Sequence, residues 1–182
     1  WRWLFMIPAG LGLFAVVCQS FLRTPELNHC HKENVNYWEA LNKISIRRVF
    51  IFIFIISFLY HGLHKWYGVY LYHVYGLDSK GISWMLIIAA MCGLIGQQIG
   101  GYISDKKGRP FACYVGMSGL ALGAMVLAGH YPMVVVPAIM GLISLSWTIN
   151  HNSISTILTD FPDEDRPAMA SLNSAVRFFS GG

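Results

Sequence analysis

Ten residues near the middle of the chain, Gly101 to Pro110, read Gly-Tyr-Ile-Ser-Asp-Lys-Lys-Gly-Arg-Pro. The run lies between two long stretches without a charged residue, at 82–104 and 110–159. A segment of about 20 apolar residues crosses a bilayer as a helix, because a helix satisfies its backbone hydrogen bonds internally. The run therefore predicts a tight cytoplasmic turn between two membrane-crossing helices.

The composition of the 182 residues favours the same class of protein. Hydrophobic residues make up 55% of the chain and charged residues only 12%, whereas a soluble domain carries about 25% charged residues. The period-two pattern typical of a strand is not sustained anywhere. The basic residues, which give a net charge of +4, lie at the ends of apolar stretches rather than in one patch. We predict an all-α membrane protein that does not bind nucleic acid.

The apolar residues fall into six segments, at 1–22, 48–72, 82–103, 111–129, 133–158 and 167–182. Most connections between them are short, as expected for antiparallel neighbouring helices. A polar stretch at 23–47 is the exception. We interpret 1–22 as a transmembrane helix, 23–47 as a cytoplasmic linker and 48–182 as an incomplete transmembrane bundle. The chain starts at Trp1, which we interpret as the start of a piece of a longer protein.

The lysines and arginines predict the orientation, since positive residues accumulate on the cytoplasmic side of a membrane. If the connections alternate between the two sides, one side holds most of these residues and the other holds Arg2 and Lys80. We therefore expect a multi-pass protein of the plasma (inner) membrane, with residues 23–47 and 104–110 in the cytoplasm.

Two segments carry glycines along one helix face, because residues three and four apart lie on the same side of a helix. These glycines are Gly93, Gly96 and Gly100 in the third segment and Gly116, Gly119 and Gly123 in the fourth. Small residues let helix backbones approach closely in lipid. We predict close helix packing along both faces.

The run at 101–110 resembles the signature loop of the major facilitator superfamily, which reads Gly-x-x-x-Asp-basic-x-Gly-basic-basic. The matching residues are Gly101, Asp105, Lys106, Gly108 and Arg109. Pro110 departs from the last basic position, which weakens any charge relay that uses it. The linker, the number of segments and the alternation of charge also fit this family. The resemblance covers the whole chain, as helix 6, the central loop, helices 7–10 and the start of helix 11.

The resemblance implies a 12-helix fold of two six-helix bundles around a cavity that opens alternately to each side. This chain would hold most of the C-terminal bundle and would need the missing N-terminal helices to transport anything. In the family, the loop carboxylate helps to hold one arrangement of the two bundles. We expect Asp105 to act as such a latch, with its charge offset by Lys106, by Arg109 or by the N-terminus of a facing helix. Gly101 would leave room for a neighbouring helix, and Gly108 would allow a tight reversal.

The second segment carries polar side chains in its second half, and these include His61, His64, Lys65 and Tyr67. Ionisable residues at membrane depth normally face a cavity or a partner. A histidine there can carry a proton, because it titrates near neutral pH. The alternative for Lys65 is that its ammonium group reaches the outer membrane surface. Both interpretations stay open at this point.

The fifth segment is too polar for a lipid-facing surface, and it holds Trp147, Asn150 and His151. Asn150 and His151 are candidates for the cavity wall. Trp147 stacks either on a ligand or on a neighbouring helix. Arg177, in the sixth segment, either binds an anionic substrate or pairs with an acid in the missing half.

The sequence as a whole favours a secondary active transporter for a small solute, with protons as the coupling ion. Within that class we lean to efflux of drugs or metabolites by antiport, and the alternative is a symporter for sugar or organic acid uptake. A membrane sensor or scaffold that moves no solute is an alternative from another class. No apolar segment contains an acid for catalysis, so no enzyme is expected, and no cofactor or metal site is expected either. His29, Cys30 and His31 are too closely spaced for a tetrahedral metal site.

Overall fold

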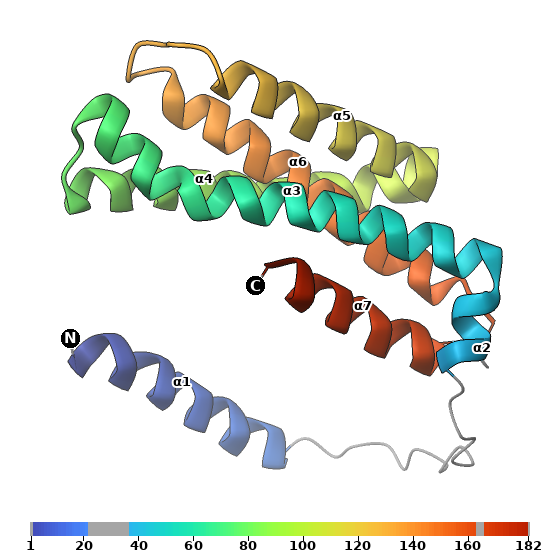
Figure 1. The fold of residues 1–182 in the computed structure, drawn as a ribbon. Helices are drawn as coiled ribbons and strands as arrows, with labels where there is room; N and C mark the ends of the chain where they lie inside the picture. Colours follow the sequence, from blue (N-terminus) through green and yellow to red (C-terminus); the bar gives the residue numbers. More distant parts are fainter. Residues whose placement is uncertain (1, 22–36, 163–165, 182) are drawn as a thin grey trace. The chain divides into compact units, whose positions relative to one another are not determined.

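The computed structural model describes residues 2–21, 37–162 and 166–181. Within these residues every regular element is an α-helix, and Figure 1 shows their order. The helices are α1 (Arg2–Phe21), α2 (Tyr37–Asn42), α3 (Ile44–Tyr75), α4 (Ser79–Lys107), α5 (Arg109–Leu127), α6 (Val136–Thr159) and α7 (Arg166–Gly181). The prediction of an all-α protein is confirmed. Helix α1 belongs to one compact unit, and helices α2 to α7 form another.

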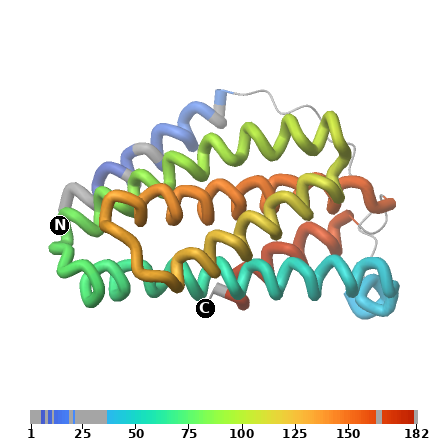
Figure 2. Tube along the Cα trace, turned by 90° about the horizontal axis from the view of Figure 1, so that it is seen from above, coloured from blue at the N-terminus to red at the C-terminus, as the bar shows by residue number. Residues whose placement is uncertain are grey.

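Three of the described helices are long and apolar enough to cross a membrane, namely α3, α4 and α5. Helix α6 has 24 residues, but serines, asparagines and a histidine fill its second half. Helices α4 and α5 pack along α6 (Figure 2), and α3 meets it through the stacking of Tyr60 on Trp147. Two of its polar side chains hydrogen-bond to these helices, Asn150 to α5 and Asn152 to α4.

The glycines of α4 and α5 form the two contact surfaces with α6, as their spacing predicted. A Cβ atom on Gly96 would lie 2.5 Å from the carbonyl oxygen of Leu145, and one on Gly100 would lie 2.8 Å from the Cα of Ile149. On the α5 side, a Cβ on Gly116 would lie 2.8 Å from the backbone nitrogen of Asn150. Real Cβ atoms do not approach backbone this closely, so only glycine permits the observed packing.

The other side of the unit is built by α3 and α7, which pack along each other, while α2 contacts both. The buried side chains of this unit are apolar and come from several helices, for example Ile53, Leu71, Met140, Ile143 and Met169. Helix α2 and the first turn of α3 lie inside the stretch expected as a linker at 23–47. A six-residue helix is too short to leave a periodic signal in the sequence. Residues 23–36 of that linker lie outside the described residues.

The turns at the two ends of α4 are short and specific. Helix α3 ends at Gly76 with φ of 63°, and the backbone N–H of Leu77 donates to the carbonyl of Leu71 at 3.3 Å. Such a left-handed ending favours glycine. Asp78 then caps α4 by accepting a hydrogen bond from the N–H of Gly81 at 2.8 Å. At the other end Gly108 alone separates α4 from α5, and its φ of 92° is open to glycine but strained for other residues.

Basic residues gather at one end of the unit. Arg47 and Arg48 lie near the start of α3, and Lys106 and Lys107 end α4. Arg109 begins α5 beside them. Figure 1 shows the start of α3, the end of α4 and the start of α7 at this same end. The charge asymmetry that the sequence suggested is therefore present in three dimensions.

Candidate functional site

A groove with a volume of about 720 Å³ opens between α3, α6 and α7. Its wall is mostly polar or aromatic and consists of His61, Trp147, His151, Ser155, Asn173, Ser174, Arg177 and Phe178. Four of the residues singled out in the sequence, His61, Trp147, His151 and Arg177, meet here although they come from three helices. A cavity of this size is in the range for small-molecule sites, about 300–1,000 Å³.

The spacing of residues in α6 explains which of its polar side chains reach the groove. Trp147, His151 and Ser155 lie four residues apart and thus on one helix face. In α7, Asn173 and Arg177 have the same spacing and face the same space. Sequence reasoning did not include Ser155, Asn173, Ser174 or Phe178, although the four-residue spacing from His151 and from Arg177 is a signal for the first two.

The guanidinium group of Arg177 is held by neutral partners. Its Nε donates to Oδ1 of Asn173 at 2.8 Å, and Nη2 makes a long 3.5 Å contact with Oγ of Ser155. No described acidic side chain forms an ion pair with Arg177. The imidazoles of His61 and His151 line the same groove. The groove is therefore a site of positive charge with many hydrogen-bond donors.

An aromatic cluster forms the floor between α3 and α6. The ring of Trp147 stacks on that of Tyr60 with centroids 4.3 Å apart and an interplanar angle of 1°. His61 and His151 approach the edge of the same indole, with centroids 5.5 and 5.8 Å away. Trp147 is only 8% exposed. Most of its surface is therefore covered, while the rest lines the groove.

Asn150 corrects an expectation, because it does not line the groove. It is fully buried at the interface with α5, where its Nδ2 donates to the backbone carbonyl of Cys113 at 3.1 Å. Its neighbour His151 does reach the groove, because consecutive residues of a helix point about 100° apart. Asn150 thus joins two helices, and its other amide atom, Oδ1, is buried without a hydrogen-bond partner.

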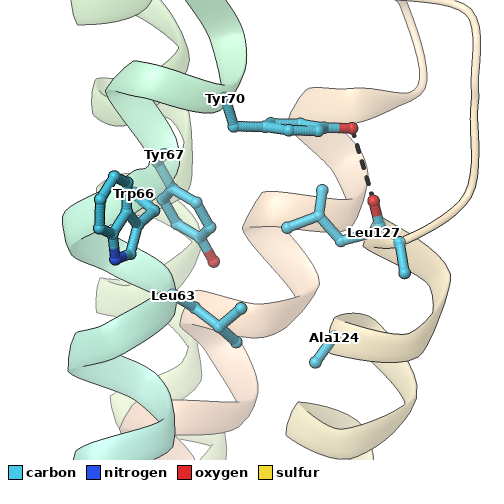
Figure 3. A pocket seen from close by; sticks show the side chains of 7 residues that line it. Leu63, Trp66, Tyr67, Tyr70, Ala124 and Leu127 are labelled. Carbon is cyan, nitrogen blue, oxygen red and sulfur yellow. Dashed lines mark hydrogen bonds between the residues drawn. The ribbon is translucent and has the colours of Figure 1, made fainter. Parts of the chain in front are cut away.

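Tyr67, His64 and Lys65 also lie outside the groove. Tyr67 lines a separate, apolar pocket of about 260 Å³ between α3 and α5 (Figure 3). In that pocket the hydroxyl of Tyr70 makes a 3.4 Å contact with the carbonyl of Leu127. His64 is exposed and its ring lies between those of Tyr60 and Tyr67, and Lys65 is exposed on α3. The helical spacing of these residues in the sequence did not distinguish the two sides of α3.

The residues of the signature loop occupy the basic end of the unit. A Cβ on Gly101 would lie 3.4 Å from Nδ2 of Asn152, so α6 passes close to it. Asp105 is exposed and has no partner among the described residues. The ammonium group of Lys106 lies 4.6 Å from the centroid of the Tyr102 ring.

Arg109 has a partner that the sequence reasoning missed. It forms an ion pair with Asp160 and donates to the backbone carbonyl of Thr156 at 2.9 Å. Arg109 therefore ties the loop between α4 and α5 to the end of α6, and it does not offset the charge of Asp105 in this structure. Arg109 and Asp160 both belong to turns at the basic end. This shared location is the only feature of the sequence that indicates the pair.

No group of three or more potential metal ligands occurs among the described residues. His29, Cys30 and His31 lie outside them. The sequence pattern of the Major Facilitator Superfamily matches the chain over residues 1–182. The chain belongs to this superfamily. The prediction of the family from the loop at 101–110 is thus confirmed.

A relative from Bacillus subtilis (strain 168) has the description "Uncharacterized MFS-type transporter YbcL". It is 30% identical over 121 residues, which are 65% of this chain and 30% of the relative. The matched part of the chain thus covers under a third of the length of that superfamily protein. No solved structure matches the chain. The superfamily match and the three membrane-length helices identify an integral membrane protein.

Proposed function

We propose that the protein is a secondary active transporter, which moves a small solute by alternating access and uses protons as the coupling ion. The observation that supports this most is the groove between α3, α6 and α7. Polar and ionisable groups are costly within a membrane and normally face a substrate pathway or a partner. Their meeting in one groove of an otherwise apolar bundle fits a path for a solute.

Protons are proposed as the coupling ion because two imidazoles line the same groove. His61 comes from α3 and His151 from α6, and both line the groove together with Arg177. Histidine changes charge between about pH 5 and 8. A solute that binds beside these imidazoles would therefore change their affinity for protons, and protons would change the affinity for the solute by the same factor.

Two directions of transport have separate support. The resemblance of the loop around Pro110 and of the turn at 161–170 to drug exporters favours efflux by antiport. The unpaired charge of Arg177 favours the second candidate, uptake of an organic acid together with protons. The basic end of the unit supports a cytoplasmic location for residues 23–47 and 104–110 in a plasma (inner) membrane.

Asp105 is proposed as a latch rather than a substrate ligand. It is exposed at the end of α4 and lacks a partner among the described residues, so its carboxylate is available to helices of the other bundle. In the full-length protein, Asp105→Asn should slow transport of every solute by a similar factor, because only the bundle-to-bundle contact is lost. Rates for two unlike solutes would measure this, and an unchanged rate would remove the proposed latch.

Counterflow tests the proposed transport. The full-length protein is placed in liposomes that are loaded with an unlabelled solute, and the entry of the labelled solute is followed with and without a pH gradient. A carrier exchanges the two pools, and coupling to protons makes accumulation depend on the gradient. A sensor or scaffold would show no counterflow for any solute in a panel of dyes, sugars and carboxylates.

A further inference from the structure

We infer that the solute carries a negative charge, as an organic anion whose carboxylate or similar group binds Arg177. This inference rests on the proposed transport function and specifies the chemical class of the solute. It depends on three observations: the balance of charge in the groove, the hydrogen bonds of Arg177, and the apolar side chains beside it.

The described residues that line the groove include no negative side chain to balance the positive ones. Arg177 is charged, and the lining side chains of His61 and His151 gain charge on protonation. The remaining residues of the wall are neutral, namely Trp147, Ser155, Asn173, Ser174 and Phe178. The helices that form the groove contain no aspartate or glutamate, from Ile44 to Tyr75, Val136 to Thr159 and Arg166 to Gly181. A cationic solute would therefore meet no carboxylate among the described residues that line the groove.

The hydrogen bonds of Arg177 orient its side chain without using all of its donors. A guanidinium group carries five N–H donors in a planar fork. Asn173 accepts from Nε, and Ser155 takes one long contact from Nη2. The other donors remain for a ligand. A planar fork of this kind fits the two oxygens of a carboxylate, which gives geometric selectivity as well as charge.

Apolar side chains border the same space and would suit the body of an organic anion. Phe178, next to Arg177 in α7, is 83% exposed. Trp147 also lines the groove, and one face of its indole stacks on Tyr60. The groove of about 720 Å³ has room for more than a bare inorganic anion. A flat acid, with its charge on Arg177 and its ring beside Phe178, would fit this arrangement.

The competing explanation is that Arg177 pairs with an acid from the helices of the other bundle. The two explanations make different predictions, because a structural ion pair supports the transport of every solute equally. A charge that binds the solute matters only for anions. Selectivity among solutes of matched shape therefore distinguishes them.

The test uses the full-length protein in liposomes and three probe classes that differ mainly in charge. These are aromatic and aliphatic carboxylates such as benzoate, their neutral amides such as benzamide, and their amidines such as benzamidine. We expect the wild-type protein to transport at least one carboxylate, and to transport neither the amidines nor the amides at a comparable rate. Arg177→Gln should lower carboxylate transport by about tenfold or more, since a charge-assisted hydrogen-bond pair is lost. Arg177→Lys, which keeps the charge but not the fork, should restore part of it.

Lys80→Gln is the matched control. It also removes one positive charge, but from the exposed start of α4, so carboxylate transport should stay at the wild-type level. Gel filtration and thermal unfolding of each variant show whether it is folded, and Arg177→Lys keeps the test valid if Arg177→Gln is unstable. A wild-type protein that moves amidines but no carboxylate would overturn the inference and leave transport standing. An equal loss for all probes in Arg177→Gln would also overturn it, in favour of a structural pair. Absence of movement for every probe would count against transport itself.

Discussion

Helix α6 has two sides that differ in kind. Toward α4 and α5 it packs against glycines, with backbone against backbone and no space between the helices. Toward α3 and α7 it faces a groove bordered by aromatic, polar and cationic side chains. The first side fixes the position of α6 and the second leaves a space for a ligand. One helix thus carries both the close contacts with α4 and α5 and the wall of the candidate site, on different faces.

The largest expected loss of stability comes from placing a larger side chain where a glycine of α4 contacts α6. Gly96→Leu should destabilise the protein by about 3 kcal/mol or more, because the new side chain would collide with the backbone of Leu145 and α6 would have to move. Thermal unfolding in detergent would measure the loss. Gly62→Leu is the matched control, since no atom lies within 4 Å of a Cβ at that position on α3. Equal unfolding temperatures for the two variants would contradict the role of the glycine side.

Substitutions of two asparagines, Asn150 and Asn173, should have effects of intermediate size. They further test the difference between the packed side of α6 and the groove. Asn150→Ala should lower stability by about 1–3 kcal/mol, because it removes a buried hydrogen bond to Cys113. Its solute preference should be unchanged. Asn173→Ala should have little effect on stability but should slow transport, because Arg177 loses the group that orients it. Thermal unfolding and solute uptake would be measured on both variants, and an altered preference in Asn150→Ala would place it in the site after all.

The smallest expected effect concerns the pair at the basic end. The side chains of Arg109 and Asp160 are 31% and 56% exposed. A pair exposed to this degree contributes about 0–1 kcal/mol. A double-mutant cycle with Arg109→Gln and Asp160→Asn should therefore give a coupling energy of this small size in unfolding. A coupling of several kcal/mol would mean that the pair, and not the glycines, holds the end of α6.

The fold was largely predictable from the sequence because its signals are strong and local. Charge-free stretches of membrane length gave the helices, and glycines spaced three and four apart gave the two contact faces of α6. The positive φ of Gly108 follows from a reversal that leaves room for one residue. These features depend on neighbouring residues in the chain, which a single sequence contains.

The site was predictable only in part, because the sequence of one helix does not show which neighbouring helix or groove each side chain faces. In α6 the run from Asn150 to Asn152 is polar throughout, and helices on several sides receive its side chains. Only the packing decides that His151 faces the groove and Asn150 faces α5. The pairing of Arg109 with Asp160 likewise joins positions about fifty residues apart, so no local pattern announced it.

The single residue between α4 and α5 has a mechanical consequence. Because only Gly108 separates the two helices, a displacement of the end of α4 also displaces the start of α5. Arg109, at the start of α5, forms an ion pair with Asp160 at the end of α6. The helices α4, α5 and α6 are therefore connected at one place. A displacement of α4 at this joint would therefore move α5 and the end of α6 together with it.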